Sequence, residues 1–388
     1  MRISGWPWLA PAGFVAAGWI ATGAARGAVE GFFQYQEQGS GVELTAYVGP
    51  PGRVEVPRTL GGKPVEAIGK EAFREKGAVT AVSLPASVTR IGERAFWGCD
   101  NLGTLVLPPR LEVLGKEAFS YCGKLSRVEL PPGLKEIPAG AFQQCGSLYE
   151  VNLPEGITTI GKHAFANCEM LVRVRLPASL TILGEGAFQY CGQIASLQLP
   201  AGLSRVGNHA FSHCTGLREI TLGSGLTHLG THAFLNCRKL AGLALPESVV
   251  EIGKHAFKGC ETLASVTLLP GLTRIPEHAF WGCDSLEKIS LPDTITVVGE
   301  EAFRDCRGLR QVFLPRQLRQ IGPRAFQGCT RLSALAVPGS VEEIGEDAFA
   351  GCAELKTLEL PLGFLEFSPK PALAVPQGVR VVPVGKGE

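Results

Sequence analysis

The sequence has almost no net charge, and this lack limits the class of partner. Lysine and arginine together number 37, and aspartate and glutamate number 36, in a chain of 388 residues. Nucleic acids and anionic membranes attract proteins mainly through an excess of positive charge. A net charge of +1 gives no electrostatic reason to expect either, so we predict no nucleic-acid partner.

The sequence also lacks the short motifs that mark common active sites. It contains no Gly-x-x-x-x-Gly-Lys-Ser/Thr phosphate loop, no Gly-x-Ser-x-Gly nucleophile turn and no His-Glu-x-x-His zinc motif. An enzyme would need polar residues that interrupt the repeated pattern of the chain in one place, and nearly every polar residue fits that pattern. We therefore predict a protein that is not an enzyme and that needs no cofactor.

What the sequence does have is an internal repeat of 23 residues. The dipeptide Ala-Phe recurs without drift, and one inserted residue would shift every later side chain. The constant spacing therefore predicts identical stacked coils. The thirteen phenylalanines of the repeat are Phe73, Phe96, Phe119, Phe142, Phe165, Phe188, Phe211, Phe234, Phe257, Phe280, Phe303, Phe326 and Phe349.

A full coil reads Cys-x-x-Leu-x-x-Val-x-Leu-Pro-x-x-Leu-x-x-Ile-Gly-x-x-Ala-Phe. The Val-x-Leu segment has the alternation of a short strand with one buried face, and proline then ends the strand. We expect the glycine after isoleucine to occupy a turn with positive φ. The Ala-Phe segment predicts one helical or 3₁₀ turn that inserts phenylalanine into the interior.

These elements resemble the BspA-type leucine-rich repeat family of bacterial surface proteins. The resemblance covers about residues 70–361 in register. It implies a repeat solenoid of the leucine-rich class, with one short parallel strand and one helical or 3₁₀ turn in each of about thirteen coils. It also implies surface binding and adhesion without naming a ligand.

All twelve cysteines follow a phenylalanine of the repeat by three residues. Successive Cα atoms would lie within disulfide range, but their Cβ vectors would run parallel, and a disulfide needs a dihedral angle near 90°. We therefore predict a ladder of small buried thiols. The cysteines are Cys99, Cys122, Cys145, Cys168, Cys191, Cys214, Cys237, Cys260, Cys283, Cys306, Cys329 and Cys352.

Five of the seven histidines share the position two residues before phenylalanine. They are His163, His209, His232, His255 and His278. Other coils carry Glu, Arg, Gly or Asp there, and such variety favours a solvated face. Weak divalent-metal binding by the last four histidines is the alternative hypothesis, and otherwise we predict no metal site.

The candidate ligand-binding site lies on the outward face of the strands. Side chains that flank the inward strand position form two columns along one face, and coils three to seven concentrate charged and hydrogen-bonding groups there. The candidates are Arg127, Glu129, Glu150, Asn152, Arg173, Arg175, Gln198 and Glu219. They could also be ordinary soluble strand residues with cross-strand pairing. Trp97 and Trp281, expected to be exposed, are a second candidate.

The two ends of the chain depart from the repeat. Residues 1–28 are predicted to be a signal peptide, with an uncharged run from Trp6 to Ala25 and cleavage near Ala25–Ala28. A retained membrane anchor is the alternative, and only then would a membrane be a partner. Residues 29–69 are expected to form an N-terminal β cap with an imperfect first coil. Residues 362–388 form a C-terminal cap or tail.

Together these features predict an exported, monomeric binding or adhesion protein. We expect it to be secreted, periplasmic or on the cell surface, and to bind a protein or glycan along its sheet face. One alternative is a structural spacer or envelope component without a specific ligand. A second is an intracellular scaffold, which would require the leader to be misread.

Overall fold

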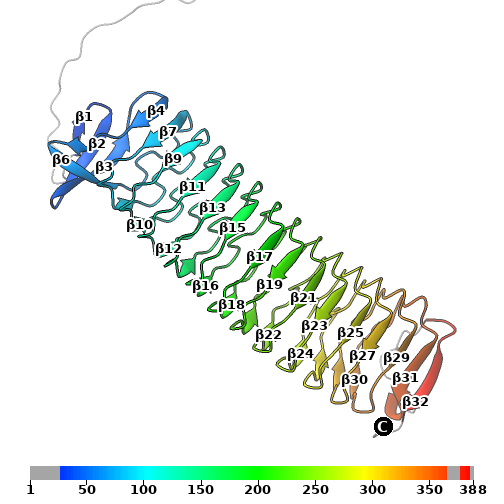
Figure 1. Cartoon of the computed structure of the whole chain (residues 1–388). Coiled ribbons are helices and arrows are strands. Elements are labelled where there is room, and N and C mark those ends of the chain that lie inside the picture. Colours follow the sequence, from blue (N-terminus) through cyan, green and yellow to red (C-terminus); the bar gives the residue numbers. More distant parts are fainter. Residues whose placement is uncertain (1–26, 365–375, 385–388) are drawn as a thin grey trace, which may run out of the picture.

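The chain winds into a long solenoid, as a computed structural model shows for residues 27–364 and 376–384. It has about fourteen turns with a repeat of about 23 residues (Figure 1). The predicted leucine-rich repeat fold is therefore confirmed. The imperfect coil before residue 70 is the additional turn. Most of the predicted leader, residues 1–26, lies outside the described residues.

The Val-x-Leu segments form the first of two strand ladders. The middle side chain of each short strand points inward and its two neighbours point outward, as the alternation predicts. Successive strands lie side by side and run parallel. The strands of this first ladder are β4 (Gly52–Glu55), β7 (Val79–Ser83), β9 (Thr104–Val106), β11 (Arg127–Glu129), β13 (Glu150–Asn152), β15 (Arg173–Arg175), β17 (Ser196–Gln198), β19 (Glu219–Thr221), β21 (Gly242–Ala244), β23 (Ser265–Thr267), β25 (Lys288–Ser290), β27 (Gln311–Phe313), β29 (Ala334–Ala336) and β31 (Thr357–Pro361).

We did not predict a second strand ladder from the sequence. It runs through the residue pairs that end in isoleucine, leucine or valine, shortly before the Ala-Phe turn of each coil. Its strands are also parallel, and most are two residues long. They are β6 (Lys63–Ile68), β8 (Arg90–Ile91), β10 (Val113–Leu114), β12 (Glu136–Ile137), β14 (Thr159–Ile160), β16 (Ile182–Leu183), β18 (Arg205–Val206), β20 (His228–Leu229), β22 (Glu251–Ile252), β24 (Arg274–Ile275), β26 (Val297–Val298), β28 (Gln320–Ile321) and β30 (Glu343–Ile344).

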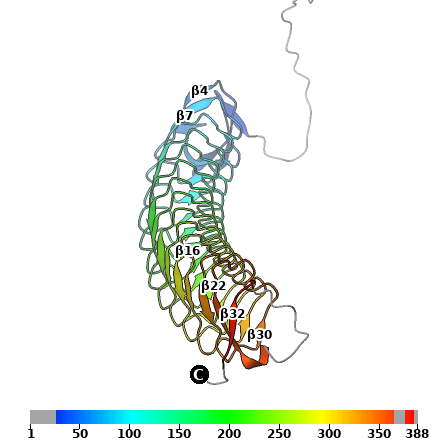
Figure 2. The ribbon, with the colours of Figure 1, turned by 90° about the vertical axis from the view of Figure 1, so that its right-hand side faces the viewer.

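The two ladders differ in continuity. In the second ladder the strands from β12 to β22 form one sheet, and those from β24 to β30 form another. The first ladder is divided more often, with interruptions between β9 and β11, β15 and β17, β19 and β21, β23 and β25, and β27 and β29. Seen from the side, the whole solenoid curves as an arc (Figure 2).

The Ala-Phe segments form hydrogen-bonded turns and not a continuous 3₁₀ helix. Alternate N–H groups make the expected bond to the residue three before, as from Arg74 to Glu71. The others donate to the next coil, as from Phe73 N to the Ala95 carbonyl at 2.7 Å. This alternation requires left-handed residues, and Glu71 has φ 59°. Every second donor is thereby turned toward the neighbouring coil, which a 3₁₀ helix would not allow.

The glycine after isoleucine serves a different purpose from the one expected. Gly92 and Gly115 are not among the described residues with positive φ. A Cβ atom on Gly92 would lie 2.6 Å from the backbone nitrogen of Lys70 in the preceding coil. On Gly115 it would lie 2.3 Å from that of Glu93. The expectation of a positive φ was wrong, because glycine here permits close approach of two backbones.

Phenylalanine side chains fill the interior as one continuous stack. The ring centroids of successive coils lie 4.9–6.1 Å apart, and the planes are close to parallel. Tyr47 extends the stack beyond Phe73 toward the N-terminal end, at 5.3 Å. The twelve largest side chains without solvent exposure all belong to this column, so it forms the centre of the hydrophobic core.

The cysteines form the predicted ladder of buried thiols. All twelve are free and buried. Each thiol donates to the carbonyl of the phenylalanine in the preceding coil, over 3.1–3.4 Å, as from Cys99 to Phe73 and from Cys283 to Phe257. Burial raises the pKa of the Cys145 thiol to about 12. The thiols therefore stay protonated at neutral pH and act as weak donors in the core.

Both ends of the described solenoid carry additional strands. Antiparallel strands β1 (Ala28–Glu30), β2 (Phe33–Gln38) and β3 (Gly41–Tyr47) precede the first coil, and β5 (Thr59–Leu60) pairs with β6. At the other end, η1 (Leu362–Phe364) is followed by β32 (Arg380–Val384), which pairs in parallel with β31. Within the described residues, no helix is long and apolar enough to span a membrane.

The phenylalanine stack leads to a prediction on stability. Phe188 lies between Phe165 at 5.3 Å and Phe211 at 5.8 Å and has no solvent exposure. We expect Phe188→Ala to lower the free energy of unfolding by about 3–5 kcal/mol, because it leaves a cavity. Contacts are nearest-neighbour, so hydrogen exchange should accelerate first in the adjacent coils. Equal acceleration along the whole rod would contradict this expectation.

Candidate functional site

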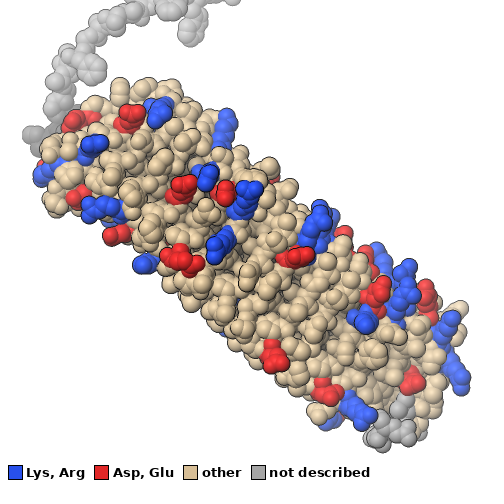
Figure 3. Space-filling view, viewed as in Figure 1, with Lys and Arg blue, Asp and Glu red and all other residues tan. Residues whose placement is uncertain are grey.

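The predicted charged residues lie together on the outward face of the first ladder. Strand register aligns Arg127 with Glu150 and Glu150 with Arg173. It likewise aligns Glu129 with Asn152 and Asn152 with Arg175. The result is two rows across β11, β13 and β15 in which charged or polar groups face solvent side by side. Figure 3 shows charged side chains of both signs gathered over these strands.

These side chains are open to solvent. Seven of the eight candidates are exposed, and Glu150 is half-buried. Arg127 forms an ion pair with Glu129 within its own strand, at 3.2 Å. The guanidinium of Arg173 lies 5.6 Å from the ring centroid of Tyr149, a residue that the sequence analysis did not select. The structure thus places all eight residues on one surface.

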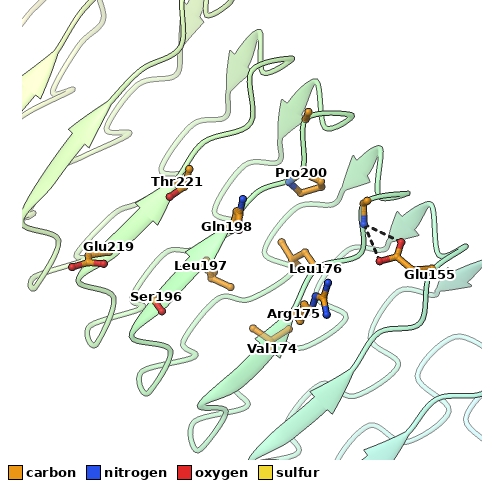
Figure 4. A pocket seen from close by; sticks show the side chains of 12 residues that line it. Glu155, Val174, Arg175, Leu176, Ser196, Leu197, Gln198, Pro200, Glu219 and Thr221 are labelled. Carbon is orange, nitrogen blue, oxygen red and sulfur yellow. Dashed lines mark hydrogen bonds between the residues drawn. The ribbon is translucent and has the colours of Figure 1, made fainter.

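A groove crosses this surface at β15, β17 and β19. Its volume is about 620 Å³, and three of the predicted residues, Arg175, Gln198 and Glu219, line it. Figure 4 shows Glu155 and Arg175 toward one end, Glu219 and Thr221 toward the other, and Leu197 between them. The groove therefore carries a carboxylate and a guanidinium at one end, a second carboxylate at the other, and apolar side chains between them.

The floor of the groove is a place where the core is incompletely covered. In most coils the middle residue of the first-ladder strand is buried, as Val151 is without exposure. Val174, which lines the groove, occupies the same repeat position but is only partly buried. Ile220, on the neighbouring β19 but outside the lining, is partly buried as well. Both strands lie beside an interruption of the ladder, which is broken between β15 and β17 and again after β19.

The polar groups around the groove are largely free to bind a partner. Glu155 accepts a hydrogen bond from the backbone of Ala178 at 3.1 Å. Among the described residues, neither Arg175, Gln198 nor Glu219 makes a side-chain hydrogen bond or ion pair. Unpaired charges of opposite sign beside an apolar floor can bind a ligand that supplies both partners.

Sequence reasoning missed part of this lining. Ser196 and Thr221 lie in the outward columns but did not stand out, because single hydroxyl residues are common on soluble strands. Glu155 lies in the loop after the strand, where no alternation marks it. The apolar floor could not be found from the repeat, because Val174 fits the pattern as well as its buried counterparts.

A second hollow, of about 410 Å³, lies on the second ladder at β16, β18, β20 and β22. Several of its polar groups already have partners. His228 lies 3.4 Å from Glu251 and 2.8 Å from the Thr227 hydroxyl, and Asn208 accepts from the backbone of Thr231 at 2.9 Å. It therefore offers fewer free groups than the groove on the first ladder.

The two tryptophans are not exposed anchors, so that expectation was wrong. Trp97 is half-buried beneath Arg74, at 5.2 Å, and lies beside Tyr121, at 5.3 Å. Trp281 is half-buried as well. Its ring lies 3.5 Å from the ammonium of Lys258, and its indole N–H donates to Asp305 at 3.2 Å. On each of the two tryptophans, a cation–π contact already covers a ring face that a partner would use.

The histidine column is not a solvated face, which also corrects the sequence interpretation. All thirteen residues at this position have φ between 51° and 64°. Side chains of different kinds occur here because the position requires a left-handed backbone conformation and not a particular side chain. His209, His232, His255 and His278 are half-buried and stack face to face, with centroids 4.3–4.5 Å apart. Their Nδ1 atoms are buried without a hydrogen-bond partner.

Protonation of this stack is opposed by its surroundings. Burial lowers the pKa of His255 to about 4, and the neighbouring positive groups His278, His232 and Lys258 add to the effect. Burial and similar neighbours lower the pKa of His232. One carboxylate, that of the buried Glu301, ends the stack at 3.1 Å from His278 Nε2. Protonation of the two central imidazoles, His232 and His255, is therefore disfavoured.

The same stack offers no convergent metal site. Parallel rings place their nitrogen atoms in rows and not around one point. Within the described residues, no group of three or more His, Cys, Asp or Glu side chains is arranged to hold a metal ion. The hypothesis of metal binding by the histidines therefore gains no support from their geometry.

Comparison with known proteins agrees with the repeat and the coil geometry. The model of the BspA type leucine rich repeat region matches in six copies, over residues 66–195, 181–310 and 273–370. The chain belongs to this family. A comparison with curated proteins found no match.

Solved structures of other members have the same solenoid. A leucine-rich repeat protein from Bacteroides ovatus is 32% identical, with a TM-score of 0.75, over 92% of this chain and 99% of that one. A leucine-rich cell surface protein from Faecalibacterium prausnitzii is 30% identical, with a TM-score of 0.57, over 87% and 95%. A leucine-rich repeat protein from Eubacterium ventriosum, 22% identical with a TM-score of 0.53 over 84% and 94%, shares the fold.

The histidine stack leads to the prediction that this part of the solenoid loses stability in acid. Unfolded histidine has a pKa near 6.5, whereas folded His255 has a pKa of about 4. The unfolded chain therefore binds the proton first, and stability falls as the pH drops from about 6.5 toward 4. His255→Asn removes this contribution and retains a residue suited to positive φ. Between pH 7.5 and 4.5, we expect the free energy of unfolding of the variant to fall by about 1–3 kcal/mol less than that of the parent.

Chemical denaturation at both pH values would measure this difference. His163→Asn is the matched control, because His163 has the same backbone conformation, with φ 53°, but its ring lies over Gly186 and has no stacked imidazole. An equal effect of the two substitutions would show that the stack is not the source of acid sensitivity.

Proposed function

We propose that this protein is an exported, non-catalytic binding protein that holds a protein ligand in the groove across β15, β17 and β19. The observation that carries the proposal is the set of free groups around that groove. Arg175 and Glu219 have opposite charges and no partner, and an incompletely covered apolar floor lies between them. The family adds support, because one solved relative is described as a cell surface protein.

The chemistry of the groove favours a protein over a glycan as the partner. A ligand that pairs with both Arg175 and Glu219 must carry both signs of charge. A ligand that covers Val174 must also supply an apolar group. Peptide segments combine all three, and interfaces typically join a desolvated apolar centre to a polar rim. The neighbouring Arg127, Glu150 and Arg173 extend the charged surface toward the N-terminal coils.

A blocking substitution gives the sharpest test of the groove. Ser196 is exposed and lines it, so Ser196→Trp should fill the groove without removing any charged group. We expect saturable binding to at least one immobilised extracellular protein in a surface-plasmon-resonance panel, and a loss of about tenfold or more in affinity for the variant. Polysaccharides belong on the same panel.

Ser265→Trp is the matched control, because Ser265 is exposed at the same strand position on β23 and does not line the groove. It should leave affinity unchanged, and both variants should keep the melting temperature of the parent. Binding that survives Ser196→Trp would move the site elsewhere. Failure to bind across the panel would favour a structural spacer without a specific ligand.

Export is the second part of the proposal and has its own test. Residues 1–28 have the composition of a leader, with small residues near Ala25–Ala28. We expect N-terminal sequencing of the protein from producing cells to find a new terminus in that stretch, in the secreted, periplasmic or surface fraction. An intact Met1 in the cytosolic fraction would instead support an intracellular scaffold.

A further inference from the structure

The Ala-Phe edge of the solenoid carries a second left-handed column, two residues after phenylalanine. All thirteen positions have φ between 56° and 74°. Glycine is sufficient there for the fold, since five coils use it. These glycines are Gly98, Gly259, Gly282, Gly328 and Gly351. A side chain at this position is therefore not required by the coil.

Six consecutive coils between Gly98 and Gly259 nevertheless carry polar or aromatic side chains in this column. We call them the neutral ladder: Tyr121, Gln144, Asn167, Tyr190, His213 and Asn236. Left-handed backbone is unfavourable for residues with a Cβ atom, and more so for tyrosine or glutamine than for asparagine. These side chains are present at a cost in folding free energy, so the geometry of the coil alone does not account for them.

The neutral ladder contains no acidic or basic group apart from one imidazole. The adjoining position of the same six coils is uncharged too, with Ser120, Gln143, Ala166, Gln189, Ser212 and Leu235. In these two columns, charged residues occur again outside the six coils, at Glu75 on one side and at Lys258 on the other. A partner that depends on ionic contacts is therefore poorly suited to this strip.

The imidazole is held in its neutral form. His213 Nδ1 lies 2.8 Å from the Ser212 hydroxyl, and its Nε2 lies 3.1 Å from the amide nitrogen of Asn236. Because the amide nitrogen can only donate, Nε2 accepts. Burial, with Arg238 and His209 nearby, lowers the pKa of His213. The ladder is thus uncharged at neutral pH.

Two exposed tyrosine rings are separated by two amides along the ladder. Tyr121 and Tyr190 are each 43% exposed. They are three coils apart, about 14 Å at the usual strand spacing, and Gln144 and Asn167 lie half-buried between them. Tyr190 stacks on His213 at 4.4 Å, so the rings are supported from within. The six positions span about 24 Å.

We propose that the neutral ladder binds an extended, uncharged glycan chain. A tyrosine ring offers an apolar face to the C–H groups of a sugar and a hydroxyl at its edge. Amides offer both a donor and an acceptor to sugar hydroxyls. A row of such groups at constant spacing suits a polymer whose own groups repeat, which a folded protein surface does not provide. This site is distinct from the groove of the first ladder.

Substitution by glycine tests the proposal without disturbing the backbone. Tyr121→Gly and Tyr190→Gly, alone and combined, replace each ring with the residue that other coils already use. Binding would be measured by isothermal titration with neutral hexasaccharides of β-1,4-glucan, β-1,3-glucan, α-1,4-glucan and β-1,4-mannan. Oligogalacturonate and heparin fragments are the acidic comparators. We expect the protein to bind a neutral chain and the double variant to lose about tenfold or more in affinity.

Glu75→Gly is the matched control, since Glu75 shares the column and has φ 56° but lies outside the neutral ladder. It should retain affinity, as should Ser196→Trp in the groove, and the double variant should keep its melting temperature. The proposal is overturned if no neutral glycan binds, if acidic fragments bind better, or if the double variant binds as the parent does. It is also overturned if the double variant melts several degrees lower, because the rings would then serve packing.

Discussion

The structure depends on one backbone hydrogen bond that is repeated between neighbouring coils. The N–H of each phenylalanine of the repeat except the last, Phe349, donates to the carbonyl of the alanine before the next one, over 2.7–2.9 Å. To point that donor along the solenoid, the residues two before and two after phenylalanine must be left-handed. The same geometry turns the ring inward, where it stacks on its neighbours, and leaves its carbonyl to accept the thiol of the next coil.

Much of this fold could be predicted from the sequence, because the 23-residue period forces equivalent residues into equivalent places. The phenylalanine stack, the cysteine ladder and the strands of the first ladder all follow from it. The second ladder could not be predicted in the same way. Its strands are two residues long, as at Arg90–Ile91, and two residues show no alternation. The close packing of backbones at Gly92 likewise depends on the distance between coils and not on any pattern within one coil.

The candidate surface was only partly predictable, for a related reason. Alternation places Arg127 or Glu219 on the outward face, but it cannot show where the pairing of neighbouring strands is interrupted. Val174 and Val151 occupy the same position of the repeat, yet one is partly exposed and the other buried. The histidine column was misread because its variety was attributed to solvent and not to backbone conformation. The frequency of glycine and asparagine two residues after phenylalanine was a signal for the left-handed columns.

The cysteine ladder has a consequence for how the chain folds. In the finished coil every thiol is buried and bonded to a carbonyl, and neighbouring side chains run parallel. Before the coils close, all twelve thiols are free to meet one another in any geometry. In an oxidising compartment, folding therefore competes with disulfide formation, and each coil that docks removes one thiol from that competition. The thiols are therefore protected from oxidation once the coils have docked, since the finished solenoid leaves no thiol for an oxidant to reach.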